Sequence, residues 1–85
     1  MSHSPAQLDT LVREILSDIA PEVDIDVLRS DADMRDALDI DSVDFLNFVA
    51  ALHGMTGVDI PERDYPMVST IGGCVSYLIT AANDA

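Results

Sequence analysis

The 85-residue chain is strongly acidic, with sixteen acidic residues against four arginines, no lysine and a formal net charge of -12. A field of this sign repels nucleic acid and anionic membranes, and it speeds association with partners that present basic docking patches. A chain this short buries roughly 60% of its unfolded surface, which argues against a multidomain enzyme with an enclosed cleft. The hydrophobic content of 48% is nevertheless that of a folded domain. We expect one domain over 1–85, with a flexible tail at 1–3 and a fraying end at 83–85.

Cys74 is the single cysteine, so a secreted fold held by intrachain disulfides is excluded. No apolar run approaches the ~18 to 20 residues that span a bilayer. The N-terminus lacks the basic start and apolar block of a signal peptide. These features predict a cytoplasmic protein that does not insert into membranes.

The first predicted helix starts after Ser4, which can cap it, with Pro5 at its first position and Gln7 completing a capping box. Apolar residues then recur at helical spacing: Leu8, Leu11, Val12, Ile15, Leu16 and Ile19. Pro21 ends this helix, because proline disfavours helical geometry in the residue before it.

The segment 21–41 has apolar residues without a sustained period, so we expect a long loop. It exceeds most loops of compact domains, which predicts that its apolar residues pin it or that it contains a turn of helix. Ten of the sixteen acids lie between Asp18 and Asp44. This part of the chain is therefore expected to form the negative face.

A second helix is predicted from Ser42, with Asp41 and Asp44 near its positive end, each contact contributing ~0.3 to 1 kcal/mol. Its predicted buried stripe is Phe45, Leu46, Val49 and Leu52, and Gly54 and Gly57 are expected to limit it to about three turns. The sequence after Pro61 favours a short third helix, which Pro66 should truncate.

The last predicted helix is capped by Ser69 or Thr70, and Gly72 and Gly73 weaken its first turn by about 1 kcal/mol each. Its apolar face is expected to comprise Ile71, Cys74, Val75, Leu78 and Ala82. The fold class predicted from these elements is all-α: a small bundle of three main helices plus one short helix, with a long first loop.

The spacing of the residues argues against three kinds of site: a calcium loop, a hydrolase centre and a zinc site. The Asp-x-Asp pairs do not continue into a calcium loop, because from Asp39 the sixth position is Asp44 and the twelfth is Ala50. A hydrolytic serine needs a neighbouring base, and His53 lies roughly 16 Å from Ser42 along the same helix. Cys74 with two dispersed histidines makes no zinc site. The sequence therefore offers no catalytic residues and no metal ligands.

Asp41-Ser42-Val43-Asp44 resembles the signature of the acyl carrier protein family, which reads Asp-Ser-Leu followed by an acid. The resemblance extends without a gap over about 26–79, at Met34, Leu38, Leu46, Val49, Ala51, Leu52, Ile60, Pro61, Thr70, Ile71 and Tyr77. It implies that 4'-phosphopantetheine from coenzyme A is attached to Ser42 by a transferase. Such a protein is a carrier and no enzyme, holding acyl groups as thioesters for fatty-acid, polyketide or related lipid biosynthesis.

The resemblance also implies two sets of further residues. An acyl pocket is expected at Val49, Leu52, Thr56, Ile60, Val68 and Cys74. A docking surface for the phosphopantetheinyl transferase and for acyl-transfer or synthase enzymes is expected at Asp36, Asp39, Asp41, Val43, Asp44, Asn47, Glu62 and Asp64. The protein is expected to act as a monomer.

The chain departs from the family pattern near this surface. Val43 replaces the usual leucine, Asp39 stands where glycine is common, and Asn47, His53 and Gly54 stand where acids are frequent. These departures predict a specialised carrier. One alternative is a carrier of amino or aryl acids, although the glycines often found before the serine are missing from "LDIDS". Another is an acidic helical adaptor that binds a basic partner without modification.

Overall fold

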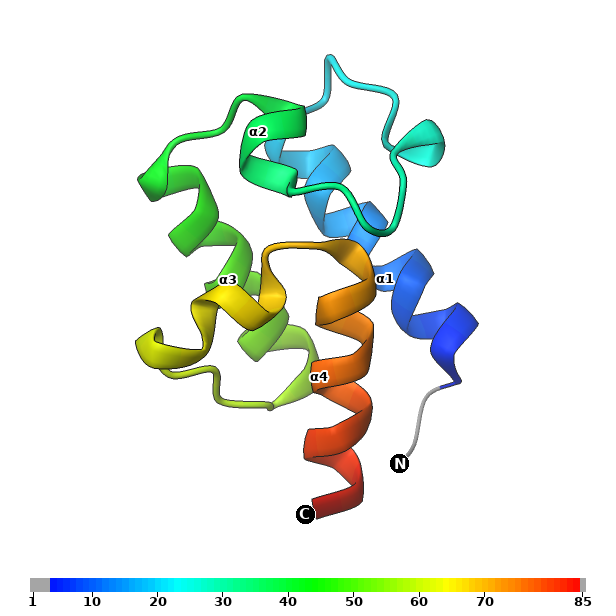
Figure 1. Ribbon diagram of the computed structural model, residues 1–85, viewed down its shortest axis with the longest axis vertical. Coiled ribbons are helices and arrows are strands. Elements are labelled where there is room, and N and C mark those ends of the chain that lie inside the picture. Colours follow the sequence, from blue (N-terminus) through cyan, green and yellow to red (C-terminus); the bar gives the residue numbers. More distant parts are fainter. Residues whose placement is uncertain (1–3, 85) are drawn as a thin grey trace.

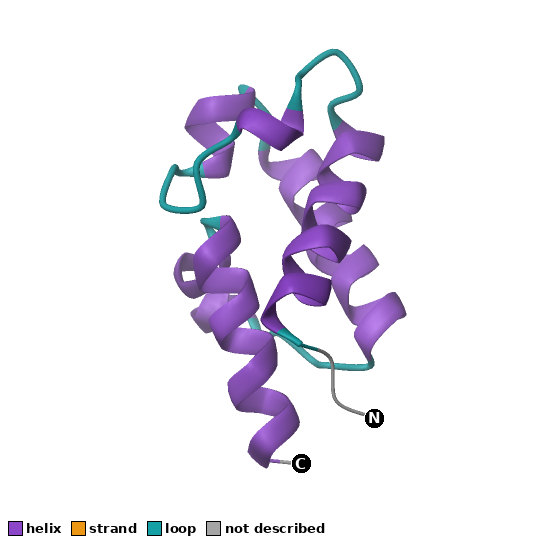
Figure 2. Ribbon diagram, turned by 90° about the vertical axis from the view of Figure 1, so that its right-hand side faces the viewer, coloured by secondary structure: helices purple, strands orange, loops and turns teal. Residues whose placement is uncertain are grey.

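The computed structural model describes residues 4–84, and within that range it is helical with no strand. The α-helices are α1 (Pro5–Ile19), α2 (Met34–Leu38), α3 (Ser42–Thr56) and α4 (Ile71–Asp84), and the 3-10 helices are η1 (Ile25–Val27) and η2 (Glu62–Val68). Figure 1 shows α2 in the upper part of the view, near the start of α3, and α4 running from the middle of the molecule to the lower end. Figure 2, turned by 90°, shows the same helices and connecting loops from the side. The predicted all-α bundle is confirmed.

The boundaries of α1 agree with the sequence signals. The Ser4 hydroxyl accepts a hydrogen bond from Gln7 N at 3.2 Å, and the Gln7 side chain accepts one from Ser4 N at 2.8 Å. The helix ends at Ile19, and Ala20 forms its C-cap directly before Pro21. The capping box and the proline therefore define both ends, as predicted. The expected tail at 1–3 lies outside the described residues.

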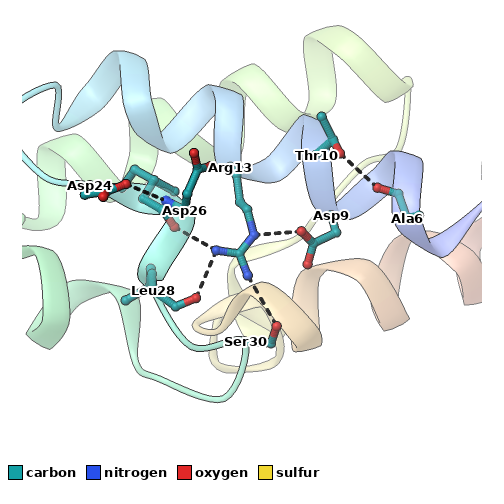
Figure 3. Close-up of polar contacts among 9 residues, drawn as sticks. Ala6, Asp9, Thr10, Arg13, Asp24, Asp26, Leu28 and Ser30 are labelled. Carbon is teal, nitrogen blue, oxygen red and sulfur yellow. Dashed lines mark hydrogen bonds and ion pairs between the residues drawn. The ribbon is translucent and has the colours of Figure 1, made fainter.

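The long first connection contains η1 and α2, and buried Ile25, Met34 and Leu38 pin it to the core. Arg13 of α1 adds a polar anchor. Its Nη1 donates to the carbonyl oxygens of Ile25 at 2.7 Å and Leu28 at 2.9 Å, while its Nε pairs with Asp9 at 2.7 Å (Figure 3). The pinned loop was predicted, but the anchoring role of Arg13 was not.

The expectations for α3 are confirmed only in part. The helix passes through Gly54, against expectation, but it ends as predicted at Gly57, which adopts a left-handed conformation with φ 73°. Leu46 is 49% exposed, whereas Phe48 is fully buried. At about 100° per residue, Leu46 points well away from the face centred on Phe45 and Leu52, but Phe48 lies within it.

The expected truncation at Pro66 is also wrong, because η2 continues through this residue to Val68. The fixed φ of proline, near -65°, is compatible with 3-10 geometry. The 3-10 form is therefore able to include a proline that was expected to stop the helix.

The start of α4 explains its two glycines. Thr70 Oγ1 accepts from Gly73 N at 2.9 Å, so Thr70 caps the helix. A side chain on Gly73 would collide with the Met67 carbonyl, and one on Gly72 would press against the Ser30 carbonyl. Both glycines therefore allow backbone segments to approach each other closely.

The predicted face of α4 is only partly buried. Ile71, Cys74 and Leu78 are in the core, Val75 is half-buried, and Ala82 is exposed, against expectation. Figure 1 shows the reason, because the last turns of α4 extend below the connection between α3 and η2. Helical geometry continues to Asp84, and residue 85 lies outside the described residues.

Candidate functional site at the start of α3

Ser42 is the first residue of α3, and its side chain is exposed. Asp41 is the N-cap, and its Oδ1 accepts from Asp44 N at 2.9 Å. The capping role is thus filled by the aspartate that precedes the serine. The Ser42 hydroxyl is not needed to satisfy the helix terminus and faces solvent, where another molecule can reach it.

Arg35 is the neighbour of Ser42 that sequence reasoning missed. Its Nη2 donates to Ser42 Oγ at 3.2 Å, and its guanidinium carbon lies 5.6 Å from the centre of the Phe45 ring. The second distance is within the range of a cation–π contact. The only available signal in the sequence was the presence of a cation seven residues before the serine, in the most acidic part of the chain.

A left-handed turn at Asp39 brings these two residues together. Asp39 has φ 53° and ψ 43°, and its N–H bonds to the Arg35 carbonyl as the C-cap of α2. L-residues rarely adopt this conformation, but aspartate tolerates it better than most and glycine adopts it freely. The turn therefore accounts for the glycine that the family pattern commonly has at this position.

A hollow of about 510 Å³ opens beside Ser42. Its wall combines charged and hydroxyl groups with an aromatic pair, in which the Phe45 and Tyr65 rings meet edge to face at 5.7 Å. The lining residues are Asp33, Arg35, Ser42, Phe45, Leu46, Glu62, Tyr65, Pro66 and Ser69. Leu46, expected in the core, thus lines the hollow instead.

The residues predicted for partner docking are largely accessible. Val43 is 64% exposed and follows Ser42 directly. Asp64 is half-buried and accepts from the Tyr77 hydroxyl at 2.7 Å, which raises the pKa of Tyr77. Asp44 is also half-buried, while the remaining predicted docking residues are exposed: Asp36, Asp39, Asp41, Asn47 and Glu62.

The residues predicted for the acyl pocket lie in or against one packed core. Five are buried, namely Val49, Leu52, Ile60, Val68 and Cys74. Thr56 is half-buried and donates to the Leu52 carbonyl at 2.6 Å. None of the six lines the hollow beside Ser42. The structure thus brings these six residues together, but their side chains pack in or against the core.

The two other candidate groups, Cys74 and His53, each contact a backbone carbonyl, but only Cys74 is buried. The Cys74 Sγ donates to the Val68 carbonyl at 3.2 Å, and burial raises the pKa of this thiol to about 12. His53 sits in the last turn of α3, with Nδ1 3.1 Å from the Val58 carbonyl. Over residues 4–84 the structure contains no cluster of potential ligands able to hold a metal ion. In the same range, no helix is long and apolar enough to cross a membrane.

Ser42 is thus an exposed serine at the start of α3 that does not cap the helix. The family model described as "Phosphopantetheine attachment site" matches residues 10–78, which is most of the chain. The protein belongs to the acyl carrier protein family, and its cofactor is 4'-phosphopantetheine.

Curated relatives agree with this assignment, and a solved structure has a similar fold. The chain is 33% identical over 61 residues to an acyl carrier protein of Lactobacillus johnsonii, covering 72% of this chain and 76% of that protein. It is 28% identical over 75 residues to that of Lactobacillus acidophilus, covering 88% and 92%. The structure of acyl carrier protein from Enterococcus faecalis has the same fold, with a TM-score of 0.79, 23% identity and coverage of 93% and 99%.

Proposed function

We propose that Ser42 carries the 4'-phosphopantetheine group and that the protein shuttles acyl groups as thioesters in fatty-acid, polyketide or related lipid biosynthesis. The observation that supports this most directly is the exposed Ser42 hydroxyl, which does not cap α3 because Asp41 fills that role. The start of α3 also favours a phosphate attached there, since the amide groups and the positive end of the helix dipole face it. When bound, the group supplies the thiol that forms the thioester.

Loading requires a base, and within residues 4–84 no basic group accepts a hydrogen bond from the Ser42 hydroxyl. Within residues 4–84 the hydrogen bond to Ser42 Oγ comes from Arg35, a donor. Oγ therefore keeps its proton until an external base removes it. A bond then forms between Oγ and phosphorus, the pyrophosphate bond of coenzyme A breaks, and the nucleotide portion leaves. We infer that a transferase supplies the base, and that the protein is a substrate of its partners and no enzyme.

The surface around Ser42 supports binding to transferase and synthase enzymes with basic docking patches. Exposed Asp36, Asp41 and Glu62 provide negative charge, in a chain whose net charge is -12. Val43 and Leu46 add apolar area beside the serine, so partners of this carrier should combine basic residues with a nonpolar contact. We further propose that the protein acts as a cytoplasmic monomer.

The proposed acyl pocket remains at Val49, Leu52, Thr56, Ile60, Val68 and Cys74. Its support is that five of these side chains form a buried apolar cluster and the sixth lies against it. Because the cluster is packed, an acyl chain enters only if these side chains move apart. Loading with longer acyl chains should then change the hydrogen-exchange protection of α3 and α4 relative to that of the unloaded protein.

Intact-mass analysis tests the attachment site. The wild-type chain, incubated with coenzyme A and a broad-specificity phosphopantetheinyl transferase, should gain the mass of one phosphopantetheine. Ser42→Ala should gain nothing. Ser69→Ala is the matched control, because Ser69 lines the same hollow, and this variant should load normally.

An absence of mass gain with several transferases would favour the unmodified adaptor. A gain retained in Ser42→Ala would place the group on another residue. Loading assays with aminoacyl or aryl donors against acyl donors separate the two kinds of carrier.

A further inference from the structure

Three arginines form side-chain hydrogen bonds within residues 4–84, and Arg35 differs from the other two, Arg13 and Arg29. Arg13 and Arg29 form ion pairs with Asp9 and Asp31, respectively. Over residues 4–84, no carboxylate lies within the 4.0 Å ion-pair limit of Arg35, although the chain is acidic and both Asp33 and Asp36 flank it in sequence. The guanidinium therefore has a positive charge that this part of the protein does not neutralise by a direct contact.

The position of the guanidinium is set by an aromatic platform. Phe45 is buried, and the guanidinium lies 5.6 Å from its ring centre while Nη2 points to Ser42 Oγ at 3.2 Å. A guanidinium has five N–H donors, and the one hydrogen bond that the Arg35 side chain makes within residues 4–84 uses only one of them. Several donors thus remain for a ligand beside the serine.

Resting on the proposed attachment at Ser42, we propose that Arg35 binds the phosphodiester that joins the serine to its prosthetic group. Attachment would place phosphorus one bond beyond Oγ, and its two non-bridging oxygens share one negative charge. Guanidinium matches such oxygens in geometry and charge, often through two parallel hydrogen bonds. Loading replaces a neutral hydroxyl by an anion at this position, so the contact with Arg35 becomes stronger in the loaded protein.

A role in binding partner proteins fits the same arginine less well. Partners with basic docking patches gain from acidic residues, and a cation at the centre of the contact would repel them. The phosphodiester supplies the opposite charge from within the loaded protein itself. Arg35 would thereby fix the first atoms of the arm next to the hollow lined by Leu46 and Tyr65, and it would reduce the repulsion between the new phosphate and the surrounding aspartates.

The test compares unloaded and loaded forms of the wild-type chain, Arg35→Gln and Arg29→Gln. Arg29→Gln is the matched control, because Arg29 is exposed and does not line the hollow. Its replacement removes one positive charge, as Arg35→Gln does, but at a different place on the surface. Loading is verified by intact mass. The phosphorus NMR resonance is then recorded in native and denatured protein, and the melting temperature is measured before and after loading.

In the wild type and in Arg29→Gln, we expect a native phosphorus shift distinct from the denatured one, and a gain in melting temperature on loading. In Arg35→Gln, the shift should move toward the denatured value and at least half of the gain in melting temperature should disappear. Arg35→Lys keeps the positive charge but lacks the paired donors of the guanidinium. Its phosphorus shift and its gain in melting temperature should lie between those of the wild type and Arg35→Gln. High salt should move the wild-type shift toward that of Arg35→Gln.

The outcomes separate this inference from the proposed function. A wild-type chain that gains no mass overturns both. Normal loading with the same phosphorus shift and the same thermal gain in wild type and Arg35→Gln overturns the phosphodiester contact alone. Slower loading of Arg35→Gln with unchanged shift and thermal gain also overturns it, and would assign Arg35 to recognition by the transferase.

Discussion

The connection between α1 and α2 and the connection between α2 and α3 are each contacted by an arginine, but in different ways. The Arg13 side chain is only 18% exposed, and its donors are bound to Asp9 and to the carbonyls of Ile25 and Leu28. Arg35 is exposed and donates to the Ser42 hydroxyl. An arginine whose donors bind backbone carbonyls of a neighbouring segment stabilises the fold. One that has several unused donors is available to a ligand.

The largest expected effect is on the Arg13 side of this comparison. Arg13→Ala leaves two carbonyls without their charged donor, and hydrogen bonds of this kind contribute ~1.5 to 3 kcal/mol. We expect the free energy of unfolding to fall by about 2 to 3 kcal/mol in chemical denaturation. Loading at Ser42 should continue under conditions where the variant is folded.

Arg35→Ala in the unloaded protein provides the matched measurement. Removing a cation–π contact and one hydrogen bond that are both exposed to solvent should cost about 1 kcal/mol, less than the loss expected for Arg13→Ala. Equal losses in the two variants would contradict the distinction between the structural and the available arginine.

A smaller effect concerns the buried thiol, which contrasts with the exposed serine. The folded pKa of Cys74 is about 12, above the ordinary value of 9.0, because burial disfavours the thiolate. Its stabilising contribution is complete below pH 9.0 and is lost as pH rises toward 12. One unit above 9.0 the loss should reach about 1.4 kcal/mol.

The slope of unfolding free energy against pH measures this loss, with Cys74→Ser as the control that keeps both tyrosines but lacks the thiol. The slope above pH 9.0 should be steeper in the wild type than in the variant. The same burial predicts that a thiol reagent labels the native loaded protein at its prosthetic group but leaves Cys74 unlabelled. Rapid labelling of the native unloaded protein would contradict the burial of Cys74.

The smallest expected effect on stability comes from substitutions of Asp39, in the turn before Ser42. Asp39 has positive φ, so Asp39→Gly should stabilise the fold by about 0.5 kcal/mol and Asp39→Ala should destabilise it by ~0.5 to 1 kcal/mol. Asp39→Asn tolerates the same conformation without the charge. If all three variants shift the melting temperature equally, charge and not backbone conformation determines the effect.

The elements that could be predicted from the sequence are those set by local chemistry. The capping box of Ser4 and Gln7 and the stop at Pro21 act within a few residues, and they give the correct ends of α1. The start of the second long helix at Ser42 was predicted from its flanking acids, and the structure adds that Asp41 takes the capping role. Local signals were sufficient to predict where these helices begin, while the attachment of a group at Ser42 remains a proposal from its motif.

The missed features depend on contacts between distant parts of the chain. Arg13 has the spacing of an ordinary surface residue, and its role appears only when η1 folds back over α1 (Figure 3). Arg35 meets Ser42 only because Asp39 turns the backbone sharply. Leu46 was misplaced because hydrophobicity alone does not fix which of two adjoining faces of a helix meets the core.

The hydrogen bond from Met34 N to the Ser69 carbonyl, at 2.8 Å, has a consequence for the order of folding. It ties the start of α2, and with it Arg35, to the residues that introduce α4, and Gly72 N likewise bonds to the Ser30 carbonyl at 2.9 Å. We expect contacts between such distant positions to form late, because long loops must close first. The surroundings of Ser42 are thus completed only when the last helix has docked. A nascent chain that ends before α4 would present the serine without its finished neighbourhood, so a transferase that reads this neighbourhood would modify the finished fold in preference to the growing chain.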